Sequence, residues 1–514
     1  MANPLMSSAI ETWILPALVF WPLLGALGVR LLGRDPEQGG IDARVLTVAV
    51  LAVEAVLAII LWFGVDTTGS GWQARVDLPW LPDLGARISL GVDGLSLPLV
   101  VMTAVIIPLA LLGSWKNVRV RTPTFGALVL MLTSGLIGVF LALDLLLFYL
   151  AWELMLIPTY LLVGVWSTAG ESRASVRYVL FTLVGSLLML VAILALWSLQ
   201  GGTSLHLDDL ARLSLSPTAQ LWMFGAFFAA FGVKSALVPF HTWLPGAQGA
   251  APTVAAVTLG IKVGAYALLR FAIPLFPSAA TDPSVRSVIL ILATISIVYG
   301  AIVAIGQTDL KRIIAYSSIS HVGFIVLGCF VLTPQSVQGA TLSMVSSGVA
   351  TTALFLLAGM LEDRLGSRDL EAFGGLAGVM PWFSVSLVVA MLATVALPGT
   401  IGFVGEFLVL IGAYGDQPVL TIIATSGVIF AAAYGLRATQ RILFEPVQES
   451  GRALPDLTGL ERVVMLVFMA AIVGLGLQPS PVIRRVERAG QTLIETVRFG
   501  PNARPALPPM SQAR

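Results

Sequence analysis

Charged residues are scarce in this chain: Asp, Glu, Lys and Arg make up 11% of its residues, whereas 57% are hydrophobic. A water-soluble domain needs about 25% charged residues to cover its surface. The sequence is therefore that of an integral membrane protein, with a mean hydropathy of +0.92. A length of 514 residues would otherwise suggest several soluble domains, but the hydropathy indicates one helical membrane domain.

Cysteine and histidine are almost absent, and this excludes most redox sites. A single cysteine, Cys329, excludes an intrachain disulfide and a multi-cysteine metal site. There is no CxxC pair for an iron–sulfur cluster, no GxGxxG segment that opens a strand–helix unit, and no histidine pair for haem at membrane depth. We therefore expect no cofactor and no metal in this chain. The formal net charge of +1 gives no indication of nucleic-acid binding, which we do not expect.

Long apolar runs fill most of the sequence. A transmembrane helix needs about 20 predominantly apolar residues, and such runs predict an all-α polytopic membrane protein with about 14 transmembrane helices. The first run lacks the basic flank and the cleavage site of a signal peptide, so we expect it to be retained as a span. The predicted spans, numbered in order, are 12–33, 44–65, 93–114, 124–143, 145–166, 176–199, 218–239, 249–275, 286–306, 312–332, 340–361, 380–412, 418–443 and 460–480.

Basic residues are concentrated in the loops that follow spans 1, 3, 5, 9, 11 and 13. The positive-inside rule places these loops in the cytoplasm and both termini on the periplasmic side. The arginine-rich tail after residue 480 argues against this orientation, but a tail is a weaker determinant than short loops. The polar connection 66–92 is expected to form a hairpin-like loop on the periplasmic side.

Two predicted spans carry the residues of broken helices. Pro239 and Pro245 follow Lys234 in KSALVPFHTWLP, and the segment LPGTIGF interrupts span 12. Proline removes a backbone donor and clashes with the preceding turn, and irregular backbone at membrane depth requires surrounding protein or a water-filled cavity. Breaks in corresponding spans predict two inverted five-helix repeats with broken helices 7 and 12. The alternative is that these prolines merely kink packed helices.

The chain then divides into four regions. Spans 1–3 with the hairpin-like loop come first, the two repeats follow, and a last span with a polar tail ends the chain. These regions comprise residues 1–114, 124–275, 286–446 and 447–514.

Four charged residues interrupt the apolar runs. A lysine at the centre of a bilayer costs roughly 2.5–3.5 kcal/mol on insertion scales, and Lys234 and Lys262 both lie inside predicted spans. Glu153 and Glu406 are carboxylates at similar depth. Charges that are kept at membrane depth usually serve ion transport or pair with an opposite charge. This set of residues therefore indicates ion transport.

Five segments together resemble the antiporter-like membrane subunits of respiratory complex I, the proton-translocating NADH-quinone oxidoreductase, and the subunit M branch in particular. The resemblance extends from about residue 91 to about residue 446. The same superfamily includes Mrp-type sodium/proton antiporter subunits and membrane subunits of energy-converting hydrogenases. The segments are DLLLFYLAWELMLIPTYLL, FGVKSALVPFHTWLP, GIKVGAYALLRF, QTDLKRIIAYSSISHVGF and LPGTIGFVGEF.

The resemblance implies a role for each of the four charges. Glu153 corresponds to the span-5 glutamate that pairs with the span-7 lysine, here Lys234. Lys262 corresponds to the central lysine of span 8, and Glu406 to the span-12 position, where the subunit M branch has a glutamate. Together they would form a water-linked proton relay along the membrane midplane. For Glu153 and Lys234 the alternative is a static buried ion pair.

Three further residues are candidates for the same relay. His241 follows Pro239 in the span-7 break, His321 lies near the start of span 10, and Asp144 opens span 5. A histidine titrates near neutrality, and Asp144 could exchange protons at the outer face. The alternatives are histidines whose hydrogen bonds stabilise the helices, and an Asp144 that caps the N-terminus of span 5.

Three positions depart from the family pattern. Where the family commonly reads HTWLPDAH, this chain has Gly246 and Gln248, and Ser347 stands where the family often has a histidine. Gln248 and Ser347 can order water but cannot take up a proton near neutral pH. The route past Lys262 would then depend on water, or the chain could be a divergent paralogue or a structural spacer that has lost transport.

Other polar residues have simpler interpretations. His206, in an outer loop, is expected to be solvated, and Arg270 is expected to extend its guanidinium towards the membrane surface. The positions of Lys311 and Arg312 are explained by orientation alone, and Glu54 is expected to contact a neighbouring subunit.

The resemblance also implies partners and setting. We expect a multi-pass subunit of the bacterial inner membrane, in contact with lipid, with other antiporter-like subunits and with small helical subunits. It would be the non-redox subunit that couples quinone reduction elsewhere to proton pumping, with flavin, iron–sulfur clusters and quinone in partner subunits. A sodium/proton antiporter subunit and a membrane subunit of an energy-converting hydrogenase are the alternatives.

Overall fold

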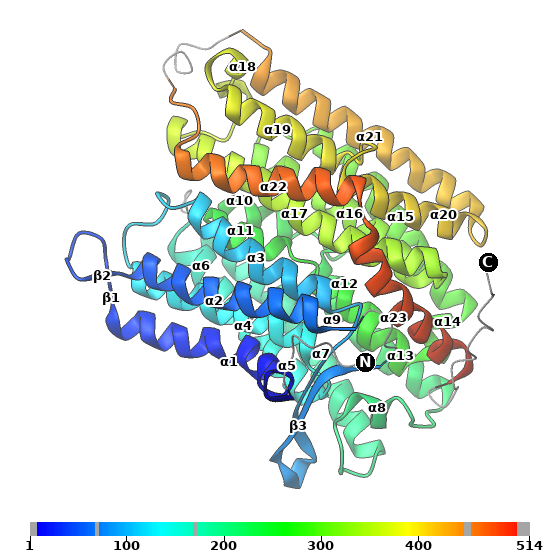
Figure 1. Ribbon diagram of the computed structural model, residues 1–514. Helices are drawn as coiled ribbons and strands as arrows, with labels where there is room; N and C mark the ends of the chain where they lie inside the picture. The colour runs from blue at the N-terminus through cyan, green and yellow to red at the C-terminus, as the bar shows by residue number, and fades with distance from the viewer. Residues whose placement is uncertain (1–7, 67–70, 168–171, 447–453, 501–514) are drawn as a thin grey trace, which may run out of the picture.

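The computed structural model describes residues 8–66, 71–167, 172–446 and 454–500 as a bundle of helices that run roughly side by side (Figure 1). Among these residues, 11 helices are long and apolar enough to cross a membrane. The other three predicted spans correspond to α3, α9 and the pair α19–α20. The prediction of an all-α polytopic membrane protein is thus confirmed. The bounds of these four helices are Leu97–Gly113, Pro217–Ser235, Pro381–Thr394 and Ile401–Tyr414.

The N-terminal region combines helices with two small sheets. β1 and β2 pair in parallel, whereas β3 and β4 form an antiparallel hairpin with Val76 opposite Leu90. The hairpin predicted within 66–92 is therefore present, although residues 67–70 lie outside the described ranges. Besides α3, the elements are α1 (Ser8–Leu32), β1 (Gly33–Arg34), β2 (Ile41–Asp42), α2 (Ala43–Gly64), β3 (Gln73–Leu81), the 3-10 helix η1 (Pro82–Leu84) and β4 (Ala86–Val92).

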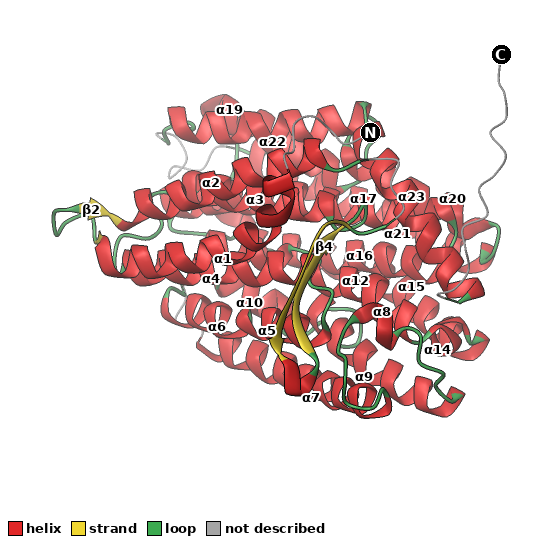
Figure 2. Cartoon of the chain, turned by 60° about the horizontal axis from the view of Figure 1, so that its bottom comes forward, coloured by secondary structure: helices red, strands yellow, loops and turns green. Residues whose placement is uncertain are grey.

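The hairpin β3–β4 reaches across one end of the bundle towards α5 and α7 (Figure 2).

The first half of the bundle contains both long helices and short helices that are joined by turns. Besides α9, the elements are α4 (Thr122–Leu141), α5 (Leu145–Leu154), α6 (Leu156–Val165), α7 (Ser172–Leu199), α8 (Leu207–Leu210), α10 (Leu244–Ala250), α11 (Thr253–Gly260), α12 (Val263–Ala267), the π-helix η2 (Leu268–Ala272), α13 (Ile273–Leu275) and α14 (Pro277–Thr281).

The second half has longer helices, and α17 is buried along its whole apolar stretch. The helices α10, α11 and α12 of the first half pack against α16 and α17. Besides α19 and α20, the elements are α15 (Pro283–Ile305), α16 (Leu310–Val331), α17 (Pro334–Leu365), the 3-10 helix η3 (Leu370–Ala372), α18 (Leu376–Val379), α21 (Pro418–Leu443), α22 (Gly459–Leu477) and α23 (Ser480–Phe499).

Both predicted interruptions are present. α9 ends at Ser235, well before α10 begins, and α19 is separated from α20 by a turn. Ala236 and Ala396, which follow the first helix of each pair, have φ angles of 58° and 55°. Such left-handed residues end helices and redirect the chain. The interruptions therefore occur in spans 7 and 12, whereas the relation of the two halves as inverted repeats stays a prediction.

Two further interruptions were not predicted from the sequence. α5 gives way to α6 at Met155, and α11 ends before Lys262, whose ψ of 47° is not helical. Pro158 explains the first, because a proline ring clashes with the carbonyl four residues earlier, here that of Leu154. No proline marks the second. Both lie in the first half, so the two halves differ in how often their helices break.

Contacts between loops agree with the predicted grouping at two ends of the bundle. Arg44 donates to the Trp115 carbonyl at 3.0 Å, which joins the connections after spans 1 and 3. At the other end, Arg286 pairs with Asp416, which joins the connections after spans 8 and 12. Which end faces the cytoplasm, and hence the side of both termini, stays a prediction.

The segment expected as a polar tail contains the amphipathic helix α23, which packs against α17 and α13 (Figure 1). Its docking requires a glycine at position 94. A Cβ atom at Gly94 would lie 1.8 Å from the Arg485 carbonyl oxygen. Residues 501–514, with two of the tail arginines, and residues 447–453 lie outside the described ranges.

Replacing Gly94 with Ala should displace α23 from the bundle. Overpacking of this kind costs about 1–3 kcal/mol, so the midpoint of thermal unfolding of the purified protein should fall and α23 should become accessible to protease. Gly474→Ala in α22 is the matched control, because no atom of the described residues, apart from the adjoining backbone of α22, lies within 4 Å of the position that a Cβ would occupy there. An unchanged midpoint for Gly94→Ala would contradict this account.

Candidate functional site

All four membrane-depth charges lie at or near helix interruptions. Glu153 is the penultimate residue of α5, Lys234 lies in the last turn of α9, and Lys262 lies between α11 and α12. Glu406 lies on the second turn of α20, just after the span-12 break. The C-terminal end of a helix favours a cation, so the end of α9 stabilises the Lys234 ammonium inside the bundle.

Lys234 is held by aromatic side chains. Its Nζ donates a hydrogen bond of 2.9 Å to the hydroxyl of Tyr178 on α7. The same atom lies 5.7 Å from the centre of the Trp152 ring and 5.2 Å from that of the Tyr178 ring. Aromatic faces attract cations, and more strongly where water is excluded. The groups that stabilise the lysine are therefore neutral, and none of them is a counter-ion.

The predicted pair between Glu153 and Lys234 is not formed within the part of the chain that the structure describes. Among the described residues no ion pair joins a Glu153 oxygen to the lysine Nζ within 4.0 Å, and Glu153 Oε1 is buried there without a hydrogen-bond partner. The reason is that the Tyr178 hydroxyl binds the ammonium, while Trp152, next to Glu153, provides the facing ring. The expectation of a direct pair, and with it the alternative of a static ion pair, is wrong for this structure.

Lys262 and Glu406 are connected through one face of α16. Lys262 is buried and donates to the hydroxyl of Ser318. One turn further along α16, His321 Nδ1 lies 2.8 Å from Glu406 Oε1. Residues three apart on a helix lie on the same face. The structure thus brings three of the predicted residues, Lys262, His321 and Glu406, into one buried series, with Ser318 as a member that the sequence did not single out.

A small polar cavity adjoins Glu406. It is lined by Ser343 and Ser347 from α17, by His321 and by Thr394, and it offers about 10 Å³ to the centre of a water molecule. That is close to the smallest space that holds one water. Within the described ranges the hydroxyls of Ser343 and Ser347 are buried without a hydrogen-bond partner. Ser347 therefore lies where it can hold a water against the carboxylate, in place of the imidazole common in the family.

His241 and Gln248 lie outside this series. His241 Nε2 is 3.3 Å from the Tyr299 hydroxyl, and Gln248 Nε2 donates to the Ala256 carbonyl at 3.2 Å. Among the described residues Gln248 Oε1 is buried without a hydrogen-bond partner. The contact of His241 fits the alternative in which the histidine stabilises the span-7 break, and its place in a relay stays a prediction. Gly246 lies in α10.

Asp144 caps α5, as the alternative interpretation predicted. Its Oδ1 accepts hydrogen bonds from the backbone N–H groups of Leu146 and Leu147, and its Oδ2 accepts one from Arg87. Burial raises the pKa of this carboxyl, although the hydrogen bonds from Leu147 and Arg87 oppose the shift. A role of Asp144 in proton exchange stays a prediction.

His206 is buried, not solvated. Its Nε2 lies 3.0 Å from Arg75 of the hairpin, and its Nδ1 faces the Asp208 N–H at 3.2 Å. An isolated β-bridge also joins His206 to Asp144. The expectation of a solvated loop residue is wrong because the hairpin folds over this loop and removes it from water.

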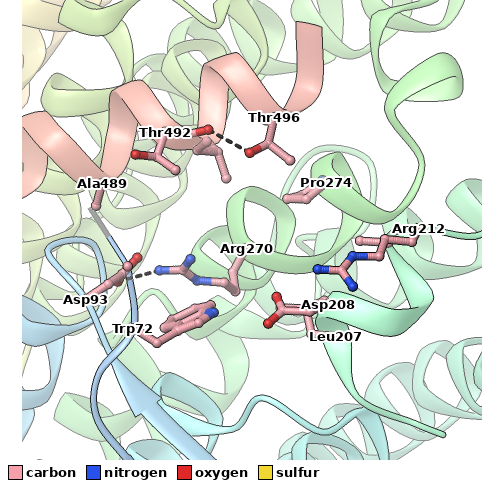
Figure 3. A pocket seen from close by; sticks show the side chains of 13 residues that line it. Trp72, Asp93, Leu207, Asp208, Arg212, Arg270, Pro274, Ala489, Thr492 and Thr496 are labelled. Carbon is pink, nitrogen blue, oxygen red and sulfur yellow. Dashed lines mark hydrogen bonds and ion pairs between the residues drawn. The ribbon is translucent and has the colours of Figure 1, made fainter. Parts of the chain in front are cut away.

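Arg270 forms an ion pair at the end of the bundle that carries the hairpin, and the extension of its guanidinium towards the membrane surface stays a prediction. Arg270 lies in the π-helix η2, and its Nη2 is 2.5 Å from Asp93 Oδ1, while its guanidinium stacks on Trp72 at 4.6 Å. Figure 3 shows this ion pair at the edge of a pocket whose other side carries Arg212. Asp93, four residues before α3, pairs with the arginine across the fold, a contact that sequence spacing could not indicate.

Lys311 forms a buried ion pair with Glu362. Its side chain is 1% exposed, and its Nζ lies 2.7 Å from Glu362 Oε2 on α17. The same Nζ donates to the Ala251 carbonyl at 3.3 Å, beside the junction between α10 and α11. The interpretation of Lys311 by orientation alone is wrong, whereas Arg312 is exposed. The pair ties the broken helices of the first half to α16 and α17.

Glu54 is buried inside this chain. Its exposed fraction is 0%, and neither carboxylate oxygen has a hydrogen-bond partner in the part of the chain that the structure describes. The expectation that Glu54 contacts a neighbouring subunit is wrong, because α1, α3 and α4 pack around α2.

Replacing Lys311 with Met should destabilise the protein strongly. The change leaves Glu362 without its nearest cation, and breaking a buried ion pair costs about 3–5 kcal/mol. The measurement is the midpoint of thermal unfolding in detergent, with Arg312→Met as the exposed control. Adding Glu362→Gln to Lys311→Met should recover part of the loss, and equal midpoints for all variants would refute the coupling.

Known proteins match this chain over nearly its whole length. The family model described as NADH:quinone oxidoreductase/Mrp antiporter, TM, matches residues 142–431. Subunit M of NADH-quinone oxidoreductase from Escherichia coli (strain K12) is 35% identical over 491 residues, which cover 91% of this chain and 95% of that protein. The subunit M from Rhodobacter capsulatus is 37% identical over 484 residues, covering 91% and 93%.

A solved structure agrees with these matches. One chain of respiratory complex I from Thermus thermophilus with bound NADH superposes with a TM-score of 0.85 and 34% sequence identity. The superposition covers 93% of the present chain and 99% of that chain. The segment matched by the family model contains every residue considered above as a candidate for the relay.

Proposed function

The chain belongs to the family of NADH:quinone oxidoreductase and Mrp antiporter membrane subunits, and from this premise we propose that it translocates protons as the subunit M of a bacterial NADH-quinone oxidoreductase. Its relatives of that name match it over nine-tenths of its length. In this role the chain carries no redox centre, and flavin, iron–sulfur clusters and quinone belong to partner subunits. Other antiporter-like subunits and small helical subunits are its neighbours in the membrane.

The observation that carries the proposal is the buried series from Lys262 through Ser318 and His321 to Glu406. The series crosses from the first half of the bundle to the second. Hydrogen bonds join Lys262 to Ser318 and His321 to Glu406, and Ser318 and His321 lie one turn apart on α16. Hydroxyl, imidazole and carboxylate groups can all accept and donate protons in turn. The polar cavity beside Glu406 supplies space for water at the end of the series.

Lys234 would load this series from the first half. A carboxylate that approaches a buried lysine favours its protonated form, and its withdrawal favours release of the proton. Glu153 has a buried oxygen without a partner, so it can turn towards Lys234 without giving up a hydrogen bond at that oxygen. In the proposed cycle, changes that begin at quinone reduction move Glu153, and the proton passes from Lys234 towards Lys262 and leaves from Glu406 to the outer face. Both termini lie on that face in this orientation.

Lys234→Ala should abolish or strongly reduce proton pumping that is coupled to NADH oxidation. The reason is that alanine leaves no group at this position that can bind a proton. The measurement is the proton-to-electron ratio of the purified complex in proteoliposomes, with Lys116→Ala in an exposed loop as the control. An unchanged ratio in the Lys234 variant would exclude the relay.

Glu406→Gln tests the other end of the series. Glutamine keeps the size of the side chain and a hydrogen bond to His321, but it cannot take up a proton near neutral pH. The proton-to-electron ratio should fall, while the assembled complex is recovered in normal amount. Glu487→Gln, at an exposed position on α23, should leave the ratio as it is. A normal ratio for Glu406→Gln would show that protons bypass this carboxylate.

A second candidate function is that of a related membrane subunit outside complex I. Gln248 and Ser347 stand at positions where the family commonly has imidazoles, which fits an altered proton route. The description of the family also covers Mrp antiporters, so the alternatives are an Mrp-type antiporter subunit and a membrane subunit of an energy-converting hydrogenase. Purification of the tagged chain in mild detergent, followed by mass spectrometry of its partners, separates these cases. Flavin and iron–sulfur subunits with NADH-oxidising activity support complex I. Small antiporter subunits alone, or a nickel–iron subunit, support the second candidate.

A further inference from the structure

An apolar groove lies between α2, α3, α17 and α22, away from the buried charges. Its volume is about 360 Å³, and every side chain that lines it is apolar. Trp62 and Val105 form part of one side, and Val349 and Phe468 part of the other. Three of the helices that flank it, α2, α17 and α22, are long and apolar enough to cross the membrane, so the groove lies at membrane depth.

The groove has the length of one membrane leaflet. Its lining along α3 extends from Pro98 at the first turn to Leu109, which is roughly 16 Å at 1.5 Å per residue. The hydrocarbon core of a bilayer is about 30 Å thick. The groove therefore runs from the end of the bundle that carries the hairpin to about the middle of the membrane.

A cation without a counter-ion lies at the outer end of the groove. Arg485 of α23 follows the lining residue Val482 by one turn, and its guanidinium stacks on Trp62 at 3.9 Å. Two of its nitrogens donate to the carbonyls of Trp62 and Pro481, at 3.0 and 2.8 Å. Its Nε is buried without a partner, and among the described residues no carboxylate lies within 4.0 Å of it.

The surroundings of Arg485 favour an external anion. Burial lowers the pKa of its guanidinium below the ordinary value, because desolvation disfavours the charged form. The close packing of α23 on Gly94 fixes the arginine at the groove.

We propose that the groove and Arg485 form a binding site for one anionic phospholipid of the leaflet next to the hairpin. An acyl chain fills the groove, and the phosphodiester contacts the guanidinium. Guanidinium groups bind phosphate through short, charge-assisted hydrogen bonds. An acyl chain packs against the apolar side chains that line the groove. Because α17 carries Val345 and Val349 on the groove side and Ser347 beside Glu406, the bound lipid also supports the helix that lines the polar cavity. The site does not depend on the proposed relay.

The test uses the intact purified complex in nanodiscs that contain phosphatidylglycerol with a photoactivatable diazirine in its acyl chain. Illumination and peptide mass spectrometry should place adducts on the groove residues of α2 and α3. Loss of a charge-assisted hydrogen bond weakens binding roughly tenfold, so Arg485→Leu should reduce this labelling by about that factor at a sub-saturating amount of probe. Arg484→Leu, at an exposed position on the same helix, is the matched control and should keep it.

A second variant keeps the test decisive if Arg485→Leu does not assemble. Val105→Trp fills the groove and leaves the arginine in place, so it should block labelling of α2 and α3 while other lipid-facing helices stay labelled. Equal labelling in the wild-type, Arg485→Leu and Val105→Trp proteins would overturn the proposal. So would labelling spread evenly over all outer helices, or a cross-link that places a partner subunit's helix in the groove.

Discussion

The interruption of helices at membrane depth is the constraint on which the rest of this structure depends. In a continuous helix the backbone N–H and C=O groups are hydrogen-bonded to one another, and none is available to a buried charge. A broken helix places unpaired backbone groups at its ends inside the bundle. Lys234 lies at the end of α9 and Lys262 between α11 and α12. The breaks therefore determine where a charge can be kept, and the packing of α10–α12 on α16 and α17 determines which charges meet.

The two lysines are stabilised in different ways. Lys234 donates to the Tyr178 hydroxyl and faces the rings of Tyr178 and Trp152, which are all neutral groups. Lys262 bonds to Ser318, one turn of α16 before the His321–Glu406 contact. Neutral hydrogen-bonding groups bind a cation less tightly than a carboxylate does. That is the arrangement expected of groups that must change their protonation state, whereas the Lys311–Glu362 and Arg270–Asp93 pairs are of the fixed kind.

Much of the fold, but only part of the site, could be predicted from the sequence. Hydropathy gave the spans, prolines and glycines gave the breaks in spans 7 and 12, and the basic residues gave the grouping of loops. The direct Glu153–Lys234 pair was predicted and is not formed, because whether two side chains touch depends on rotamers and on a third residue, Tyr178. The Arg270–Asp93 pair joins residues 177 positions apart, and a local sequence pattern cannot predict such a contact.

The sequence by itself determined that the chain is a bundle of membrane helices with charges at membrane depth, since the cost of exposing polar groups to lipid acts on each segment separately. Tertiary structure alone decided which of those charges are connected. The series from Lys262 to Glu406 exists because α12, α16 and α20 pack together, and His206 and Glu54 are buried because other segments cover them. Contact and burial are properties of several segments at once, and a single segment of sequence cannot specify them.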